Sequence, residues 1–306
     1  MAKSSSFESF VVFVVHLLSC TDMIKALILD VDGVLLDARP SYHAVAEEAA
    51  RRAVARILGE QAARAAPFDR TAEVAVFKAA GGFNDDWEMS RAIGILIWLR
   101  AQGRAPPLRE FVEGGGVERL ARRWSAPAAM NQASIARDCG SLYGGRSHCR
   151  LLFGFDPPAD APERGYWERE ELLVDRELLE RVAARMPVAL FTGRNPGEAE
   201  LALLRTGLAV PPGLRWVADG RPRKPDPEGL LRLCAQMLPP RGGAGFTGDG
   251  PEPKAEASIV ALFIGDTADD RAAAEAAQAG GAPLRYAHVQ EPGDTARALA
   301  ALLNDT

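Results

Sequence analysis

Two aspartates separated by one residue stand where an apolar strand should end. Asp30 and Asp32 follow the apolar run 24–29, and Gly33 comes directly after them. An ionised carboxylate is costly to hold beside a hydrophobic core unless a cation or several hydrogen bonds compensate its charge. A magnesium ion would compensate both carboxylates, which indicates chemistry at this strand end. The alternative is an ordinary strand-to-turn Asp-Gly, because such turns are common.

A second strand end carries a hydroxyl and a glycine. The buried-strand pattern 187–191 is followed at once by Thr192 and Gly193. The glycine would let the backbone approach a ligand closely, and the free N–H groups of a helix expected from 196 would attract an anion. Alternatively, Thr192 does no more than cap that helix.

A lysine follows the strand-like segment 214–218. Lys224 lies between Pro222 and Pro225, in a chain where only 5 of the 36 basic residues are lysines. A lysine at this position is therefore a mild sign that the site requires a compact ammonium rather than a guanidinium. Chance alone also explains one such lysine, so the inference needs the other segments.

The third apolar run, 259–264, ends in an acidic cluster. Asp266, Asp269 and Asp270 lie within five residues and lead into an alanine-rich helix. Capping and favourable helix-dipole electrostatics explain many acidic residues near a helix start. Three aspartates exceed that need, and they would give a hard cation its oxygen ligands.

These four segments, in this order, resemble the signature motifs of the haloacid dehalogenase superfamily. The motifs are Asp-x-Asp at 30–32, the threonine, the lysine, and Gly-Asp-x-x-x-Asp at 265–270. The resemblance covers residues 23–37 and the chain from about 174 onward. Gly248-Asp249 mimics one motif, but no strand pattern precedes it, so we exclude it.

The resemblance implies an α/β fold, a doubly wound parallel sheet with an inserted α-helical cap of the subfamily IA type. We expect strands near 24–30, 187–191, 214–218, 259–264 and 283–287, with the site at their carboxyl ends where the winding reverses. The helices expected between them are 175–185, 196–206, 226–238 and 268–279. The core is then 23–38 with 174–306, and 239–257 is a Gly/Pro-rich loop without a chemical role.

The cap is expected at 39–173 and reads as mostly helical. Its helices are expected at 41–58, 69–80, 84–101, 108–124 and 129–142. Three of its residues are candidates for substrate specificity: Lys78, Asn84 and Arg146. The structural alternative is a helix stop at Gly81-Gly82 with a restart capped by Asn84, and a plain surface turn around Arg146.

The resemblance also implies a mechanism. Asp30 would attack phosphorus and form an aspartyl-phosphate, while Asp32 would act as general acid and base. Thr192, Gly193 and Lys224 would bind the phosphate. Mg²⁺ would be held by Asp30, the main-chain oxygen of Asp32, Asp266 and Asp270, with Asp269 as a less suited substitute for Asp270.

The expected function is a magnesium-dependent phosphatase that hydrolyses a small phosphomonoester. Asp32 and the Asp266 cluster disfavour the dehalogenases of the superfamily, which need neither. A phosphomutase keeps the same residues and remains an alternative, and a catalytically idle binding module is another. The stretch 81–87 is similar to a subfamily in which some members are joined to a histidine-biosynthesis enzyme. Histidinol phosphate and phosphoglycolate are therefore candidate substrates.

Composition and charge fit a globular enzyme of small metabolites. The 306 residues are 47% apolar and 25% charged, and the net charge of -5 argues against a nucleic-acid surface. The four cysteines show no metal-ligand spacing and are expected to be reduced thiols of a cytoplasmic protein. Whether the protein is a monomer or a homodimer stays open.

The first 22 residues contain an apolar run at 10–18 that looks like a signal peptide. The run is too short to span a bilayer, and only Lys3 precedes it. We expect residues 1–22 to be an extension outside the fold, with membrane attachment as the alternative.

Overall fold

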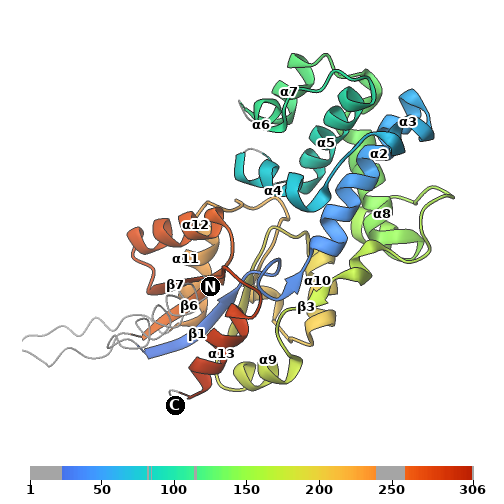
Figure 1. Ribbon diagram of the computed structural model, residues 1–306. Helices are drawn as coiled ribbons and strands as arrows, with labels where there is room; N and C mark the ends of the chain where they lie inside the picture. The colour runs from blue at the N-terminus through green and yellow to red at the C-terminus, as the bar shows by residue number, and fades with distance from the viewer. Residues whose placement is uncertain (1–22, 81–82, 84, 114–115, 239–258, 305–306) are drawn as a thin grey trace, which may run out of the picture. The chain divides into compact units, whose positions relative to one another are not determined.

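The computed structural model describes residues 23–80, 83, 85–113, 116–238 and 259–304. The chain divides into two compact units, Met1–Asp37 with Glu171–Thr306, and Ala38–Glu170. We call the first the core unit and the second the helical unit (Figure 1). The extension 1–22, the glycines 81–82 and the loop 239–257, all singled out in the sequence, lie outside the described residues.

Five parallel strands form the sheet of the core unit, in the order β5-β4-β1-β6-β7. Their bounds are β1 Met23–Leu29, β4 Val188–Phe191, β5 Arg215–Trp216, β6 Ile259–Gly265 and β7 Leu284–His288. In the centre, Leu29 lies opposite Leu190 on one side and Ile264 on the other. The strands read as continuous apolar runs because a parallel sheet covered on both faces has no solvent side. The predicted doubly wound α/β fold is confirmed.

Helices cover both faces of this sheet. Leu27 and Leu29 of β1 pack into one hydrophobic core, and Ala26 and Ile28 pack into another on the opposite face, as the alternation of a strand requires. The first core includes residues from α9 (Arg176–Ala183), α10 (Pro196–Thr206) and α13 (Asp294–Asn304). The second includes residues from α11 (Glu228–Met237) and α12 (Ala268–Ala279) (Figure 1).

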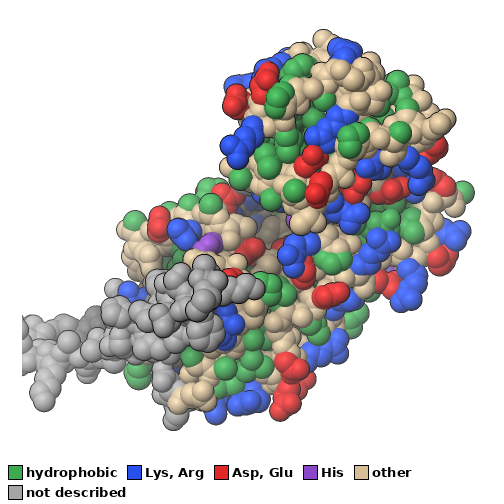
Figure 2. Space-filling model, viewed as in Figure 1, with side chains coloured by type: hydrophobic (Ala, Val, Ile, Leu, Met, Phe, Trp, Pro, Cys, Tyr) green, Lys and Arg blue, Asp and Glu red, His purple; other side chains and the backbone are tan. Residues whose placement is uncertain are grey.

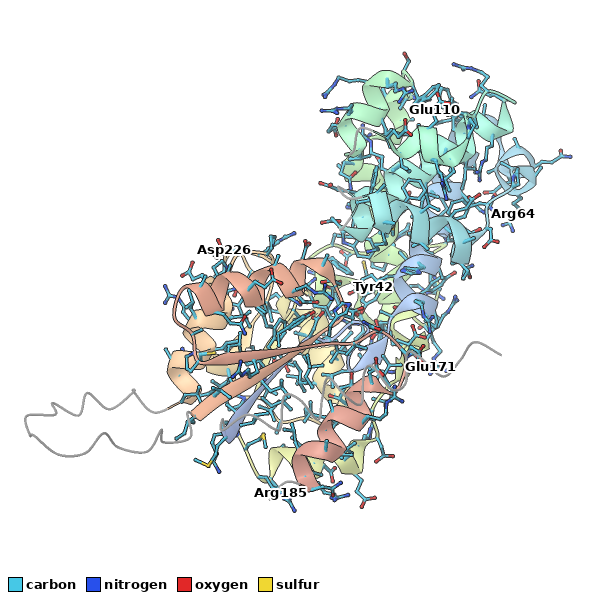
Figure 3. The ribbon with its side chains drawn as sticks, turned by 60° about the vertical axis from the view of Figure 1, so that its left-hand side comes forward. Tyr42, Arg64, Glu110, Glu171, Arg185 and Asp226 are labelled. Carbon is cyan, nitrogen blue, oxygen red and sulfur yellow. The ribbon has the colours of Figure 1, made fainter. Side chains whose placement is uncertain are left out.

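A hydrogen bond ties two helices of the first face together. Arg185, which follows α9, donates from Nη1 to the carbonyl of Leu303 in α13 at 2.6 Å (Figure 3). On the other side of the sheet, the Asp226 side chain accepts from the Glu228 amide at 2.9 Å at the start of α11. The first contact holds α9 and α13 together, and the second caps the start of α11.

The winding of the sheet reverses at β1. From β1 the chain reaches β4 and then β5 on one side, and later β6 and β7 on the other. Open α/β sheets bind ligands outside the carboxyl ends of the strands at such a switch point. The residues directly after β1, β4 and β6 are Asp30, Thr192 and Asp266.

Two short strands stand where the chain leaves and re-enters the core unit. β2 (Leu36–Asp37) pairs antiparallel with β3 (Glu171–Leu172). A further hydrogen bond joins the Leu173 amide to the Leu35 carbonyl at 2.9 Å. The two ends of the core unit that flank the helical unit are therefore held side by side.

The helical unit is built around α2 and α5. Its α-helices are α2 Ala44–Leu58, α3 Glu60–Ala65, α4 Arg70–Ala80, α5 Asp86–Ala101, α6 Leu108–Val112, α7 Val117–Arg123 and α8 Gln132–Phe153. Three short turns, η1 Arg39–His43, η2 Ala128–Met130 and η3 Tyr166–Arg169, complete it. Small residues permit close packing of α2 on α5: a Cβ on Gly94 would lie 3.7 Å from the Ala50 backbone.

Several predicted helix boundaries in this unit are wrong. The helix expected at 108–124 is two helices, α6 and α7. The stretch 142–146, expected to be a surface turn, is a largely buried kink within α8, where the dihedral angles of Gly145 are not helical. Gly145 absorbs a kink there with φ of +62°, and a Cβ on it would lie 2.4 Å from the Gly165 amide nitrogen. Gly145 and Gly165 thus permit close backbone packing at a break in the helix.

The strand expected at 214–218 is also shorter, because β5 covers only two residues. Among the described helices, none combines the length and the apolar character needed to cross a membrane. The three cysteines in the described residues, Cys139, Cys149 and Cys234, are free and buried.

Candidate active site

A buried lysine joins two carboxylates at the carboxyl end of the sheet. Lys224 Nζ lies 2.9 Å from Asp30 Oδ1 and 2.6 Å from Asp270 Oδ1. The three side chains are 12%, 7% and 0% exposed, so the contact is almost closed to water. Nζ also lies 5.0 Å from the centre of the Phe191 ring and 5.8 Å from that of Phe263, where the ring faces favour a cation.

Three aspartates at this end of the sheet are close enough to share one ion. Single carboxylate oxygens of Asp30, Asp266 and Asp270 lie within 4.8 Å of one another. Oδ1 of Asp266 is buried and has no hydrogen-bond partner among the described residues. A buried carboxylate oxygen without a donor is costly unless a cation satisfies it. This all-oxygen set fits a hard divalent cation such as Mg²⁺.

Asp270 also caps a helix. Its Oδ2 accepts from the amide and the hydroxyl of Thr267 at 3.0 and 2.6 Å, in a capping box at the start of α12. Helix capping, the structural alternative for this residue, therefore accounts for Oδ2, while Oδ1 contacts Lys224. Asp269 is not a member of the aspartate cluster.

Burial, with a smaller effect of the neighbouring carboxylates, raises the pKa of two of these aspartates. Burial raises the pKa of Asp30 well above its usual range, although Lys224 opposes the shift. Burial and the neighbouring Asp270 raise the pKa of Asp266 to about 7. Burial alone would lower the pKa of Lys224, but Asp30 and Asp270 raise it to about 12. The site thus holds an excess of negative charge that one lysine compensates only in part.

Thr192 is placed by the sheet rather than by the helix that follows it. The side chain is buried, and the amide donates to the Trp216 carbonyl at 3.0 Å. The helix α10 is capped by Asn195 in a capping box with Glu198. The alternative in which Thr192 caps this helix is therefore wrong. A Cβ on Gly193 would meet nothing within 4 Å, so the backbone there is open on that side.

The loop after β1 approaches the loop after β6 so closely at Gly33 that only glycine fits there. Gly33 has φ of +72°, and a Cβ on it would lie 2.0 Å from Asp266 Oδ2. Its amide donates to the Leu36 carbonyl at 2.9 Å, which closes the turn after Asp32. The glycine after the two aspartates thus keeps the space that the Asp266 carboxylate occupies.

One residue at the site was missed in the sequence. The guanidinium of Arg194 reaches Asp32 with Nη2 at 2.6 Å from Oδ1 and Nε at 3.2 Å from Oδ2. The Arg194 side chain is 1% exposed. In a chain that uses arginine at most basic positions, nothing in the sequence distinguishes this one.

The three cap candidates lie in the helical unit and not in the core unit that carries the motifs. Lys78 is half-buried on α4. Arg146 is exposed and forms an ion pair with Glu163 at 2.6 Å. Asn84 lies outside the described residues, and the helix cap assigned to it is made by Asp85, whose side chain accepts from the Trp87 amide at 2.9 Å.

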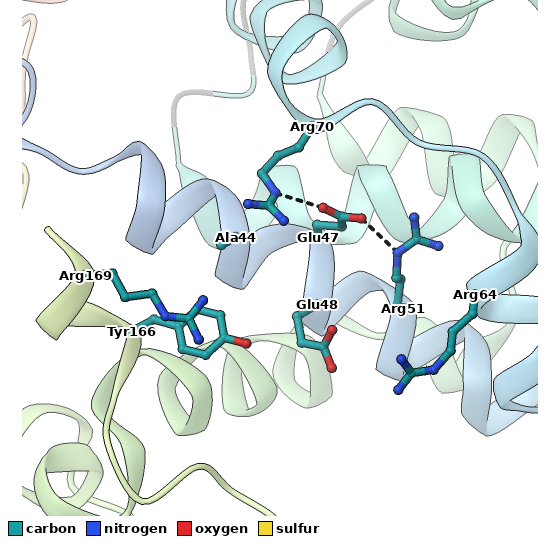
Figure 4. A pocket seen from close by; sticks show the side chains of 8 residues that line it. All are labelled: Ala44, Glu47, Glu48, Arg51, Arg64, Arg70, Tyr166 and Arg169. Carbon is teal, nitrogen blue, oxygen red and sulfur yellow. Dashed lines mark hydrogen bonds and ion pairs between the residues drawn. The ribbon is translucent and has the colours of Figure 1, made fainter.

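The helical unit also contains a polar hollow of about 350 Å³ (Figure 4). Glu47 lies between Arg51 and Arg70 there, at 2.9 and 2.8 Å. The hollow contains none of the residues predicted to act in catalysis, and Figure 2 shows acidic and basic side chains interspersed over this unit. We interpret it as part of a surface ion-pair network.

A second hollow, of about 280 Å³, adjoins the aspartate cluster inside the core unit. It is lined by Asp266, Ala268, Arg271, Ala272, Glu275 and His288. His288 Nδ1 lies 2.9 Å from the Tyr286 hydroxyl, which in turn donates to the Gly265 carbonyl at 3.2 Å. The hollow therefore gives access to Asp266 from the α12 side.

Comparison with solved structures supports the assignment of this fold. The phosphatase Tt82 from Thermococcus thioreducens is 26% identical, covers 91% of this chain and 99% of its own, and superposes with a TM-score of 0.65. The chain has the fold and the ordered motifs of the haloacid dehalogenase superfamily. The helical unit, Ala38–Glu170, is inserted in the chain between the first and the second motif.

Other matches are more distant. A structural-genomics X-ray structure is 14% identical over 91% of this chain and 94% of its own, with a TM-score of 0.54, and shows the fold alone. A subfamily IA hydrolase of the haloacid dehalogenase superfamily from Geobacter sulfurreducens PCA matches at 19% identity, over 87% and 88% of the two chains, with a TM-score of 0.41. No protein-family model and no curated protein matches the chain.

The close approach of Gly33 to Asp266 predicts a strong effect of one added methyl group. In Gly33→Ala, the Cβ would displace the Asp266 carboxylate and strain a backbone with positive φ. We expect loss of most catalytic activity and a weaker stabilisation by Mg²⁺ in thermal unfolding. Gly213→Ala is the matched control, because a Cβ there meets nothing within 4 Å. Full activity of Gly33→Ala would contradict the proposed placement of Asp266.

The raised pKa of Asp266 predicts a pH-dependent stability. Its folded-state pKa of about 7 exceeds the ordinary 3.8, so the charged carboxylate destabilises the fold increasingly from about pH 4 to pH 7. Without divalent ions at pH 8, Asp266→Asn should be more stable than the parent by about 1–4 kcal/mol, a gain absent near pH 4. Thermal unfolding with EDTA measures this, and Mg²⁺ should stabilise the parent more than the variant. A variant less stable than the parent at pH 8 would show that the charge carries no such cost.

Proposed function

We propose that this protein is a magnesium-dependent phosphatase that hydrolyses a small phosphomonoester through an aspartyl-phosphate. The observation that carries this proposal is the position of Asp30, which lies between a buried ammonium and a carboxylate cluster at the switch point of the sheet. The likeness to Tt82, which is named a phosphatase, supports hydrolysis.

Asp30, Asp266 and Asp270, with the main-chain oxygen of Asp32, would hold the metal ion. When bound, Mg²⁺ would supply positive charge between the nucleophile and the phosphate, which would otherwise repel each other. The orphaned Oδ1 of Asp266 supports this role, because the protein itself offers that oxygen no donor among the described residues.

Asp30 would act as the nucleophile. A carboxylate oxygen of Asp30 would form a bond to phosphorus as the bond to the alcohol oxygen of the substrate breaks. Water would then attack phosphorus, release inorganic phosphate and restore the carboxylate. Lys224 holds Asp30 Oδ1 at 2.9 Å and so fixes the orientation of the attacking group.

Asp32 would move the protons. In the first step its proton would pass to the alcohol oxygen that leaves, and in the second its carboxylate would take a proton from the attacking water. Asp32 is suited to this exchange because its side chain is 38% exposed, whereas that of Asp30 is 7% exposed.

Thr192, Gly193 and Lys224 would bind the non-bridging oxygens of the phosphoryl group. Fixed donors in a water-poor site stabilise the charge that develops there by several kcal/mol. The sheet fixes Thr192, and two carboxylates fix Lys224, so little reorganisation would be needed.

Histidinol phosphate and phosphoglycolate remain candidate substrates within this class. Lys78, Asn84 and Arg146 are proposed to contribute to the choice between substrates from the helical unit. A phosphomutase would use the same core residues and differ in returning the phosphoryl group to a sugar.

Replacement of the nucleophile should abolish hydrolysis. We expect Asp30→Asn to lower kcat/KM at least about 1,000-fold, because the covalent step is lost. Acid-quenched parent protein should carry the mass of one phosphoryl group on Asp30, and the variant should not. Mass spectrometry and a phosphate-release assay measure the two effects, and EDTA should remove activity that added Mg²⁺ restores.

Circular dichroism and thermal unfolding provide the control that the variant is folded. A folded Asp30→Asn protein with the activity of the parent, or turnover unaffected by EDTA, would rule out the proposed mechanism.

A screen of small phosphomonoesters with Mg²⁺ separates the phosphatase from the mutase. We expect release of inorganic phosphate from one or a few substrates and no isomerised sugar phosphate. Both products are measured in the same reactions by a phosphate assay and by ³¹P NMR. Turnover of a sugar phosphate only by isomerisation, dependent on a bisphosphorylated sugar, would favour the mutase.

A further inference from the structure

We propose that Arg194 is a positioning residue for the proton-transfer step, acting through Asp32. This inference rests on the proposed phosphatase function and adds a residue that the four motifs do not supply. Its basis is a buried guanidinium that grips one oxygen of Asp32 more closely than the other.

The grip is asymmetric. Arg194 Nη2 lies 2.6 Å from Asp32 Oδ1, and Nε lies 3.3 Å from the same oxygen and 3.2 Å from Oδ2. Oδ1 therefore accepts the short bond, while Oδ2 has a single long contact with the guanidinium. Oδ2 is the oxygen left to carry a proton to the leaving group and to take one from water. A planar fork can fix a carboxylate in this way, whereas a lysine would hold it at one point.

The main chain of Arg194 is fixed by two hydrogen bonds, and its side chain is buried. The Arg194 side chain is 1% exposed, its amide donates to Thr192 Oγ1 at 3.3 Å, and its carbonyl accepts from the Ala218 amide at 2.8 Å. Arg194 is therefore built into the same loop as the phosphate-binding Thr192. The loop couples the position of the proton-transfer group to that of the phosphoryl group.

Stability is a weak explanation for this pair. A buried ion pair often contributes little compared with apolar residues of the same size, because both charges lose their hydration. Asp32 is also partly exposed, so it did not need a buried partner to be tolerated. The two neighbouring aspartates are thus served by different cations, Lys224 at Asp30 and Arg194 at Asp32.

The experiment compares two leaving groups. An alkyl phosphate that the parent hydrolyses needs a proton on its leaving oxygen, whereas p-nitrophenyl phosphate has a leaving group that departs without one. In Arg194→Gln we expect the ratio of kcat for the alkyl ester to kcat for the aryl ester to fall at least about tenfold, with little change in KM. Arg194→Lys, which keeps the charge and loses the fork, should lower the ratio in the same direction.

A matched control separates positioning from a general loss of packing. Arg215 is also mostly buried in the core unit, and it forms an ion pair with Glu200 and a hydrogen bond to the Val210 carbonyl at 2.7 Å. Arg215→Gln should lower stability and leave the leaving-group ratio unchanged. In an Asp32→Asn background, Arg194→Gln should change the ratio no further, because its effect passes through Asp32.

An unchanged ratio of kcat values in Arg194→Gln, with equal losses for both esters, would overturn this inference. The proposed function would still stand in that case, because the parent protein is active. If Arg194→Gln does not fold, Arg194→Lys serves for the same comparison, and an unchanged ratio in that variant overturns the inference as well. A parent protein that hydrolyses neither ester would overturn the proposed function and this inference with it.

Discussion

The buried contact of Lys224 with Asp30 and Asp270 is the interaction on which the rest of the site depends. It places one positive charge among three carboxylates whose oxygens lie within 4.8 Å of one another. Burial, together with the neighbouring carboxylates, raises the pKa of Asp30 and Asp266 although Lys224 opposes both shifts. The fold therefore carries an electrostatic cost at this end of the sheet that a divalent cation would relieve. Destabilising groups and shifted pKa values of this kind are concentrated at functional sites.

The sheet and the positions of its motif residues could be predicted from sequence for one physical reason. Strands buried on both faces leave continuous apolar runs, and the carboxyl ends of parallel strands meet at one edge. Asp30, Thr192 and Asp266 each follow directly on such a run, so their proximity follows from the topology. Lys224 is farther from its strand, and only the combination with the other segments indicated its place.

Other features depend on contacts that local sequence does not contain. The pairing of Arg194 with Asp32 joins residues 162 positions apart, and neither neighbour of Arg194 indicates it. In the helical unit, the glycine pattern indicated a break in the helix near Gly145 but not its burial or its close approach to the Gly165 backbone. The predicted N-cap of α5 was wrong by one residue, because the side chain of Asp85 caps this helix in place of Asn84. The residues of this unit that we propose to contribute to substrate choice belong to none of the four motifs.

The pairing of β2 with β3 has a consequence for how such proteins diversify. The helical unit leaves and re-enters the core between two strands that are hydrogen-bonded to each other, Leu36–Asp37 and Glu171–Leu172. The two strands are paired like those of a β-hairpin, and the helical unit takes the place of the hairpin loop. The loop-closure cost of such a connection rises only slowly with its length. Exchange of the whole insertion for an unrelated one would leave strand order, register and the aspartate loops intact. The β2–β3 pairing thus separates the strand ends that carry the motifs from the helical unit.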